Sequence, residues 1–330
     1  MLLLSPFFAP DPGGVATHLV DLCGYLSKKR YHVYVLTLYP IKIPKTEWKS
    51  YECQNKVKIL RSWWIGQNLY LRLEKFPILQ SCYLIPFLFV HAFSFFLSHH
   101  DRIGIVHAHD LPSGIVARIL SKVFSKKCVI SLHILLPING KETIVRFILN
   151  LFDRILVISN KSKQRLVDIG TSQVKITTFY YWVDQSFFKP LNKSLCKEEL
   201  GLRNKFVCLF VGRLLQEKGV RLLLEVAETF KDIGRGPCFL VVGQGPLVEE
   251  VKSASKRLKN VIYAGRVDNK NLGKYYSAAD ITVVPSMYEE GFGRVIIESL
   301  FCGTPVVASN RGAIPEALDL SVGRLLEPKV

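Results

Sequence analysis

Closely spaced cysteines are absent from this sequence of 330 residues. Its eight cysteines stand singly, and no C-x-x-C pair occurs. This absence argues against a zinc ribbon and against a disulfide framework, and it favours a reducing cytoplasm. The segment from Met1 to Pro6 also lacks the basic start of a secretory signal peptide, so we expect no such peptide.

Two further absences narrow the function. A dinucleotide-binding enzyme needs G-x-G-x-x-G after its first strand and an acid at the end of its second strand. Here the first turn holds only Gly13 and Gly14, and the apolar segment Val33 to Thr37 ends without an acid. We therefore expect no NAD enzyme. The sequence carries no zinc finger and no aromatic RNP signature, so we expect no nucleic-acid partner.

Acidic residues are scarce in the first part of the chain. Residues 1–199 hold 26 Lys and Arg against 13 Asp and Glu, a net of +13, whereas residues 200–330 hold 18 against 14, a net of +4. A basic surface favours an anionic partner. With nucleic acid set aside, we expect a phospholipid surface or a phosphorylated acceptor as that partner.

The chain is long enough for two domains, and apolar residues make up 49% of it. Apolar segments alternate with segments of helical spacing, which predicts an α/β fold with parallel, doubly wound sheets. We expect one domain over residues 1–192 and a second over 193–330, with a polar linker at 192–204. Strands are expected near residues 1–5, 33–37, 57–60, 105–110, 128–133, 155–159 and 174–177, then 206–211, 239–242, 261–264, 281–284, 306–308 and 323–326.

The apolar run from Phe76 to Leu97 is long enough to raise the question of a membrane-spanning helix. Pro86, His91 and Gln80 interrupt it, and the strand-helix alternation continues on both sides of it. We expect a buried helix with one face toward lipid, and hence peripheral attachment at the inner face of a membrane.

The segment Pro285 to Glu298 concentrates the chemistry. An apolar strand precedes it, the turn Gly291-Phe292-Gly293 lies in its middle, and helical spacing starts at Arg294. The start of such a helix offers unpaired N–H groups and the positive end of a dipole, which form an anion site. Glu290 precedes this site and Glu298 follows it. A plain strand-turn-helix corner with two solvated acids is the alternative.

This segment resembles the corresponding loop of retaining family 4 glycosyltransferases. Glu290 and Glu298 reproduce the E-x7-E spacing of that family. The resemblance implies the GT-B fold, in which two Rossmann-like domains face a central cleft. It also implies that Glu290 contacts the sugar of a nucleotide-sugar donor and that Glu298 contacts the ribose. Family members normally continue with a further helix that returns to the first domain, so we expect the second domain to be incomplete at Val330.

The resemblance extends to other donor-binding positions. Arg213 and Lys218, framed by Gly212 and Gly219, match the diphosphate clamp of the family, and Arg266 with Val267 lies where the family holds the nucleotide base. His133 matches a strand-end position at the donor sugar. The expected catalytic residues are Glu290, His133, Arg213 and Lys218. The expected donor-binding residues are Gly14, Arg213, Lys218, Gly243, Arg266, Val267, Glu290, Gly291, Phe292, Gly293, Arg294 and Glu298.

The acceptor side is expected in the first domain. The turn with Gly13 and His18 resembles the first loop of the family, and His109 with Asp110 follows a strand of the predicted sheet. The alternative is that Gly13 and Gly14 form a plain turn, that His18 is a helix-surface residue, and that His133 is a hydrogen-bonded histidine at a strand end. His107 and His109 alternate as a metal pair would, but no third ligand stands at metal spacing, so we expect no metal.

The reaction that follows from the resemblance is a retaining, metal-independent sugar transfer. The donor would be a nucleotide-diphosphate sugar and the acceptor a glycan or a lipid-linked molecule, with no cofactor. Arg213, Lys218 and the amides at Gly291 to Arg294 would stabilise the leaving diphosphate. Two alternatives stay open: a sugar-nucleotide epimerase on the same fold, and a non-catalytic membrane-binding protein.

Overall fold

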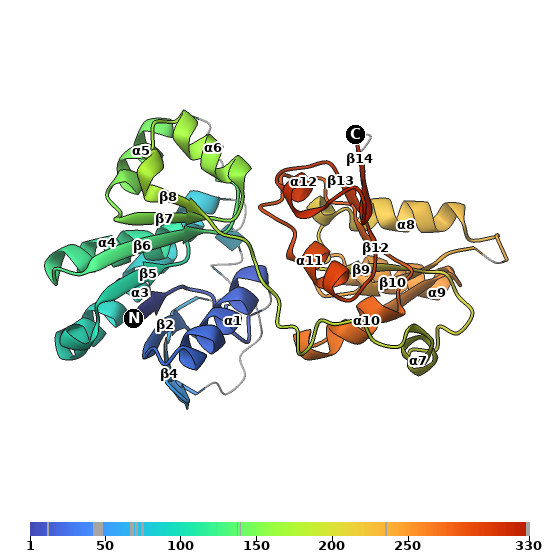
Figure 1. Ribbon diagram of the computed structural model, residues 1–330, viewed down its shortest axis with the longest axis horizontal. Helices are drawn as coiled ribbons and strands as arrows, with labels where there is room; N and C mark the ends of the chain where they lie inside the picture. The colour runs from blue at the N-terminus through green and yellow to red at the C-terminus, as the bar shows by residue number, and fades with distance from the viewer. Residues whose placement is uncertain are drawn as a thin grey trace. The chain divides into compact units, whose positions relative to one another are not determined.

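The computed structural model describes residues 1–11, 13–41, 49–66, 69, 72–73, 76–136, 138, 140–234 and 236–327. The chain forms two compact units, Met1–Tyr180 and Tyr181–Val330 (Figure 1). Each unit is built on its own sheet with helices packed against it. The α/β class with two Rossmann-like parallel-sheet units is thereby confirmed.

The sheet of unit 1 has eight strands in the order β3-β4-β2-β1-β5-β6-β7-β8. All neighbouring pairs are parallel except β3 with β4, which forms an antiparallel hairpin. The sequence did not indicate β3. The strands are β1 (Leu2–Leu4), β2 (Val33–Leu38), β3 (Tyr51–Gln54), β4 (Val57–Ser62), β5 (Ile105–Ala108), β6 (Lys127–Leu132), β7 (Arg154–Val157) and β8 (Ile176–Thr178).

Helices cover the sheet of unit 1, and its inner strands are apolar because both of their faces are buried. Every residue of β1 and β2 is buried. The helices are α1 (Gly14–Lys28), α3 (Pro77–His99), α4 (Leu111–Val123), α5 (Glu142–Asn150) and α6 (Asn160–Asp168), with short 3-10 turns η2 (His100–Arg102) and η3 (Gln173–Lys175).

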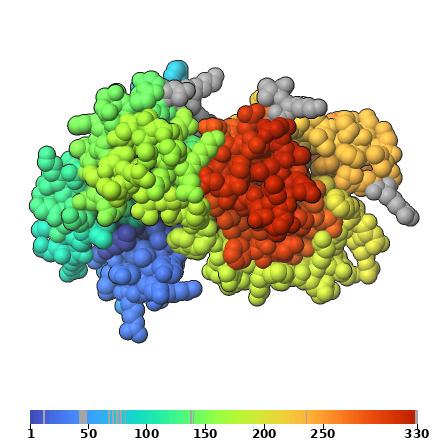
Figure 2. Space-filling view, turned by 45° about the horizontal axis from the view of Figure 1, so that its top comes forward, coloured from blue at the N-terminus to red at the C-terminus, as the bar shows by residue number. Residues whose placement is uncertain are grey.

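Helix α3 corresponds to the apolar run seen in the sequence. Leu84, Leu88 and Phe96 on one side of it are buried in the core of unit 1. Val90 and Leu97 on another side are 68% and 61% exposed. Together with α4 this helix forms the teal surface of unit 1 in Figure 2. Among the described residues, the stretch 82–102 is long and apolar enough to cross a membrane by length and composition alone, and 28% of its 18-residue apolar part is buried.

The sheet of unit 2 has six strands in the order β11-β10-β9-β12-β13-β14, and all of its pairs are parallel. The strands are β9 (Val207–Val211), β10 (Cys238–Val242), β11 (Val261–Gly265), β12 (Ile281–Val284), β13 (Val306–Ser309) and β14 (Gly323–Leu326). The helices are α7 (Lys193–Glu199), α8 (Val220–Thr229), α9 (Val248–Arg257), α10 (Leu272–Ala278), α11 (Arg294–Phe301) and α12 (Ile314–Ala317), with η4 (Gln216–Lys218) and η5 (Asn269–Asn271).

The boundary between the units falls after Tyr180, before the position expected from composition. The segment that follows Tyr180 packs on unit 2 because it is apolar: Val183 and Phe188 are buried in the core of that unit, and Leu191 N donates to Ser277 Oγ at 3.2 Å. The polar stretch expected as a linker includes helix α7. Most charged residues of this helix are exposed, which gives it the composition of a linker.

Each sheet has one point where the winding direction of the chain reverses. In unit 1 this point lies between β1 and β5, and in unit 2 it lies between β9 and β12. Ligands of open α/β sheets bind outside the carboxyl ends of the strands at such a point. The topology therefore directs attention to the segments that follow β1, β5, β9 and β12.

Candidate functional site

Glu290 lies in the segment that follows β12, at the switch point of unit 2. Its side chain is buried, and both of its carboxylate oxygens are bound. Lys218 Nζ forms an ion pair with Oε1. Ser286 Oγ donates to the same oxygen at 2.7 Å, and Tyr288 Oη donates to Oε2 at 2.7 Å. Charge-assisted bonds of this kind fix the Glu290 carboxylate in one orientation.

Tyr288 serves this cluster in two ways. Its ring centroid lies 4.9 Å from Lys218 Nζ, within the range of a cation–π contact. Burial raises the pKa of its hydroxyl, and the negative charge of Glu290 raises it further. The hydroxyl therefore stays protonated and remains a hydrogen-bond donor to Glu290.

Backbone contacts hold Lys218 against this cluster. The segment after β9 carries the lysine, and Met287 N from the segment after β12 donates to Glu217 O at 2.8 Å. A Cβ at Gly219 would lie 1.9 Å from Pro285 O, and Gly219 has a φ of +74°. Glycine permits both the backbone angle and the close approach. The sequence motif around Gly219 therefore has a structural reason.

A third segment, which follows β13, closes on the backbone of Glu290. Ala313 N donates to Glu290 O at 2.8 Å. Gly312 has a φ of +60°, and a Cβ there would lie 2.2 Å from Glu290 O. Sequence reasoning missed Gly312 because nothing in its neighbourhood resembles a ligand-binding motif.

Glu298 lies in α11, one helical turn beyond Arg294. Arg294 Nε donates to Glu298 Oε1 at 2.8 Å, and Tyr276 Oη from α10 donates to Oε2 at 2.8 Å. Glu298 is 4% exposed and Arg294 is 8% exposed. Burial raises the pKa of Tyr276 well above its usual value, and Glu298 adds to the shift. Sequence reasoning missed Tyr276 because it stands in an ordinary helical segment.

The turn before α11 has the form expected for an anion site. Gly293 has a φ of +79° and immediately precedes the helix, which begins at Arg294. Gly291 and Phe292 are buried, and the Phe292 ring lies 6.0 Å from the Tyr181 ring. The first N–H groups of α11 lack partners within the helix, so they can bind an anion.

The other expected donor-binding residues of unit 2 lie at the same edge of the sheet. Arg213 follows β9 and is half-buried, and its guanidinium makes no ion pair or hydrogen bond with the described part of the chain. Gly243 N donates to Gly265 O at 2.8 Å, which places the carboxyl ends of β10 and β11 side by side. Arg266 and Val267 follow directly after β11.

Unit 1 gathers four buried histidines at its own switch point. His109 follows β5, and its backbone N donates to Leu4 O of β1 at 3.1 Å. His109 Nδ1 lies 3.1 Å from His133 Nε2 after β6. The His18 ring of α1 lies 5.2 Å from the His133 ring, and His107 Nε2 lies 2.8 Å from Ser131 Oγ. The structure thus brings together three expected residues, His18, His109 and His133.

Burial keeps His107, His109 and His133 neutral. It lowers the pKa of His107 to about 4, and it lowers the pKa of His109 and of His133 well below the usual value, with the neighbouring histidines adding to both shifts. Burial raises the pKa of Asp110 to about 6, an effect that hydrogen bonds from Ser113 partly offset. The Asp110 carboxylate caps α4 by accepting from Ser113 N at 2.7 Å, so the residue has a structural role at the expected place.

A group of three potential metal ligands in unit 1 differs from the pair considered from the sequence, because it includes His109 but not His107. His18, His109 and His133 each offer one ring nitrogen, and these atoms lie within 4.8 Å of one another. Neutral imidazole is the form that binds a metal. Two of the nitrogens already form a hydrogen bond, and the three-histidine group contains no acid or thiol. The arrangement is compatible with direct polar contacts to a sugar hydroxyl as well as with a metal.

The glycines of the first turn lie at the start of α1. Gly13 precedes the helix with a φ of +140°. Gly14 is the first residue of the helix, and a Cβ there would meet nothing within 4 Å. Gly14, which is expected to bind the donor, belongs to unit 1, and the other residues expected to bind the donor belong to unit 2.

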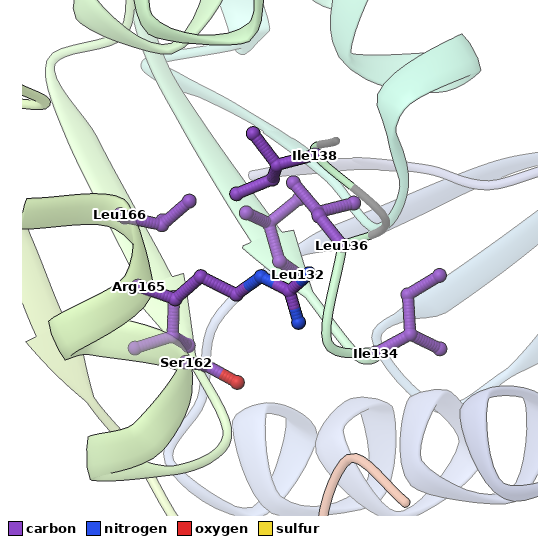
Figure 3. A pocket seen from close by; sticks show the side chains of 8 residues that line it. Leu132, Ile134, Leu136, Ile138, Ser162, Arg165 and Leu166 are labelled. Carbon is purple, nitrogen blue, oxygen red and sulfur yellow. The ribbon is translucent and has the colours of Figure 1, made fainter. Parts of the chain in front are cut away.

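A small cavity in unit 1 is excluded as a ligand site. Figure 3 shows the apolar side chains around it, among them Leu132 at the end of β6, Leu136 from the segment after β6, and Leu166 from α6. Its volume is about 10 Å³. A space of that size holds one water at most.

Comparison with known families and proteins agrees with the two-unit architecture. Residues 12–187 match the family model "Glycosyltransferase Family 4", and residues 193–329 match "Glycosyl transferases group 1". The structure is similar to that of Anabaena HepE in complex with UDP and glucose, with a TM-score of 0.71, 21% identity, and coverage of 99% of this chain and 85% of that chain.

Two curated relatives are similar over parts of the chain. A D-inositol 3-phosphate glycosyltransferase of Mycobacteroides abscessus is 35% identical over 176 residues, which are 50% of this chain and 39% of that protein. The UDP-Gal:alpha-D-GlcNAc-diphosphoundecaprenol alpha-1,3-galactosyltransferase of Escherichia coli is 30% identical over 232 residues, which are 64% of this chain and 58% of that protein. Both matches span less than two thirds of the relative's length. Because one family model covers more than half of the sequence, the chain belongs to glycosyltransferase family 4.

Proposed function

We propose that this protein transfers a sugar from a nucleotide-diphosphate donor to an acceptor, with retention of configuration. The observation that carries the proposal is the cluster at the switch point of unit 2, where Lys218 pairs with Glu290 and Arg294 pairs with Glu298 beside the start of α11. Two fixed carboxylates that flank an anion site suit a ligand with hydroxyl groups at both ends and phosphates in its middle.

Each residue of the cluster has a role in this proposal. Glu298 accepts hydrogen bonds from the ribose hydroxyls, and Glu290 accepts them from the donor sugar. Arg213 and Lys218 bind the diphosphate and stabilise the charge that it gains when it leaves. The availability of Arg213 supports this role, since its guanidinium has no partner among the described residues.

The bond changes are those of a same-face substitution. The bond between the anomeric carbon and the diphosphate oxygen breaks, and the acceptor oxygen bonds to that carbon from the side that the diphosphate leaves. The acceptor proton passes to an oxygen of the leaving phosphate. Retention rests on the resemblance to retaining family 4 enzymes. Of the unit 1 residues, we assign His133 to the donor sugar and His18, His109 and Asp110 to the acceptor side.

We also propose a glycan or lipid-linked acceptor, and reversible attachment of unit 1 to an anionic membrane on the cytoplasmic side. The relative from Escherichia coli supports the former, because its name specifies a diphosphoundecaprenol acceptor. Exposed apolar residues of α3, including Val90 and Leu97, support the latter, as does the +13 balance of residues 1–199.

The test of the transfer is release of nucleoside diphosphate from a panel of UDP, GDP and ADP sugars. We expect Arg213→Ala and Lys218→Ala each to weaken donor binding or transfer by about 2 kcal/mol, roughly 30-fold, because each loses a charge-assisted contact to the diphosphate. Arg221→Ala is the matched control, since Arg221 forms an exposed ion pair with Glu250. Near-wild-type rates in both variants would show that Arg213 and Lys218 do not bind the diphosphate. Isomerised nucleotide sugar without release of nucleoside diphosphate would favour an epimerase.

A further inference from the structure

A groove in unit 1 lies outside the residues assigned above. It has a volume of about 450 Å³, within the range of small-molecule sites. One wall is formed by α1 and the other by the β3–β4 hairpin, and the turn after β1 forms one end. Its lining includes Val20, Cys23 and Gly24 from α1, and Val57 and Ile59 from β4.

The groove is apolar along its floor, and polar residues such as Glu52 and Gln54 of β3 line one side of it. Its α1 wall runs from Val20 to Lys28, a length of about 12 Å at the helical rise. Cys23, Val57 and Ile59 are 4%, 6% and 5% exposed and form part of the apolar cluster between α1 and the sheet. Gly24 widens the groove, because a Cβ there would meet nothing within 4 Å.

The two ends of the groove differ in chemistry. At the carboxyl edge of the sheet lie Phe8, Ala9 and Pro10 of the turn that leads to Gly13. Arg61 at this end is already committed, with an ion pair to Glu52 and a bond of 2.9 Å to Ala9 O.

The opposite end is basic and carries exposed aromatic rings. Lys28 lines it, Lys29 and Arg30 follow in the next turn, and Lys56 Nζ donates to Arg30 O at 3.5 Å. Tyr25 and Tyr31 near this end are 52% and 59% exposed. Basic residues with amphipathic aromatic rings are typical of a membrane interface.

We propose that this groove binds the apolar chain of a lipid-linked acceptor. The proposal rests on the proposed function and specifies its acceptor. The lipid chain would leave the anionic membrane at the basic end of the groove, near Lys28, and would lie along the apolar floor. Its phosphorylated sugar end would then reach the turn after β1, beside Gly13 and His18. Both the charge at one end and the continuity with the acceptor-side turn at the other match this occupant.

Binding of dodecyl phosphate and butyl phosphate, below their micellar concentrations, tests the groove without any sugar transfer. Calorimetry on the full chain should show dodecyl phosphate bound at least tenfold more tightly than butyl phosphate. Gly24→Leu fills the groove without a backbone clash and should remove this preference. Ser98→Leu adds the same side chain to an exposed position of α3 and should leave the preference intact.

Thermal unfolding separates this result from misfolding, because Gly24→Leu places a better helix former within α1 and should unfold at or above the wild-type temperature. Equal affinity of wild type for the two phosphates would overturn the groove, as would a preference that survives Gly24→Leu. If Leu97→Ser instead removed the preference for dodecyl phosphate, the alkyl chain would bind the exposed side of α3. This result would also overturn the groove proposal. Failure of the proposed transfer would appear separately, as no diphosphate release from the sugar panel.

Discussion

Two buried carboxylates of unit 2 are held by different kinds of partner. Glu290 is bound by a half-buried lysine and two hydroxyls, whereas Glu298 is bound by a buried arginine and one tyrosine. A lysine is a mobile point charge and an arginine a rigid fork. Glu290 can therefore exchange its partner when a ligand arrives more readily than Glu298, which is fixed within α11.

This difference predicts different effects of the same substitution. Glu298→Gln should weaken binding of the nucleoside diphosphate of the best donor at least tenfold with the fold intact, because an amide replaces one acceptor oxygen with a donor where two hydroxyls must be accepted. Glu290→Gln should act mainly on kcat. Titration calorimetry with that nucleoside diphosphate and initial rates with the best donor measure the two effects. Small and equal effects of both substitutions would show that this segment is a plain strand-turn-helix corner and not a donor site.

Stability should depend on pH through the buried histidines. The pKa of His107 is about 4 in the folded chain, against about 6.5 in the unfolded chain. Between these values the unfolded chain binds more protons, so this contribution is complete above pH 6.5 and is lost as pH falls towards 4. His109 and His133 act in the same direction, and Asp110, with its raised pKa, acts in the opposite direction.

The matched variant is His107→Gln, which keeps a group able to bond Ser131 and removes the titration. Between pH 7 and pH 5, wild type should lose about 2 kcal/mol more free energy of unfolding than the variant, measured by urea unfolding. Identical pH dependence in the two proteins would show that His107 already titrates normally in the folded chain.

Sequence reasoning at this scale succeeded where the chemistry lies in one contiguous segment. The segment with Glu290, Gly293 and Glu298 folds as the strand, turn and helix that its pattern predicts. Tyr276 and Gly312 contact that segment from separate elements. Their roles depend on tertiary packing, for which no local pattern exists.

The position of Glu290 depends on two loops that pack against the loop in which Glu290 lies. The segment after β9 approaches this loop at Pro285 through Gly219. The segment after β13 approaches Glu290 itself through Gly312. Both approaches are too close for any side chain. The geometry of the carboxylate is thus set by the packing of three backbone segments.

Gly312→Ala should therefore destabilise unit 2 and displace Glu290. Its added Cβ would meet Glu290 O at 2.2 Å, and overpacking of this kind costs about 1–3 kcal/mol beyond the backbone strain. Gly303→Ala is the control, because Gly303 has a similar φ of +77° and its nearest contact would be 3.7 Å away. Thermal unfolding and affinity for the nucleoside diphosphate of the best donor measure the difference, and equal losses in both variants would mean that backbone strain alone is responsible.

Most elements follow from apolar periodicity, and the exceptions have physical reasons. Strand β3 was not predicted because three of its four residues are exposed and the strand has no buried face. Helix α7 was not predicted because only Cys196 of its residues is buried. Hydrophobic periodicity reports burial, so elements with little burial give little signal.

The positive charge of the chain is concentrated in unit 1. Exposed basic side chains lie at the amino ends of its strands and on the adjoining helix ends. These are Lys28, Lys29, Arg30, Arg102, Lys122 and Lys127. Exposed apolar side chains lie close to these turns, with Leu97 on α3 and Val123 on α4 at 61% and 63% exposure. The two helices are neighbours, since the Phe96 and Phe124 rings lie 4.9 Å apart.

This combination predicts reversible binding to anionic vesicles. Each basic residue near such a surface contributes about 1 kcal/mol, and the contribution falls within a Debye length. The double variant Arg102→Ala, Lys122→Ala should therefore lower the partition onto anionic vesicles by about 2 kcal/mol, roughly 30-fold. The matched control is Lys252→Ala, Lys256→Ala on exposed positions of α9 in unit 2.

Flotation at low and high salt measures the bound fraction. Wild type should float with anionic vesicles at low salt and be released at high salt, because salt screens the attraction while the few exposed apolar side chains hold the protein only weakly. The unit 1 variant should lose most of its binding and the unit 2 control should retain it. Absence of wild-type binding would contradict surface attachment. Binding that survives both salt and carbonate would point instead to α3 crossing the bilayer, since insertion of an apolar helix does not depend on screened charge.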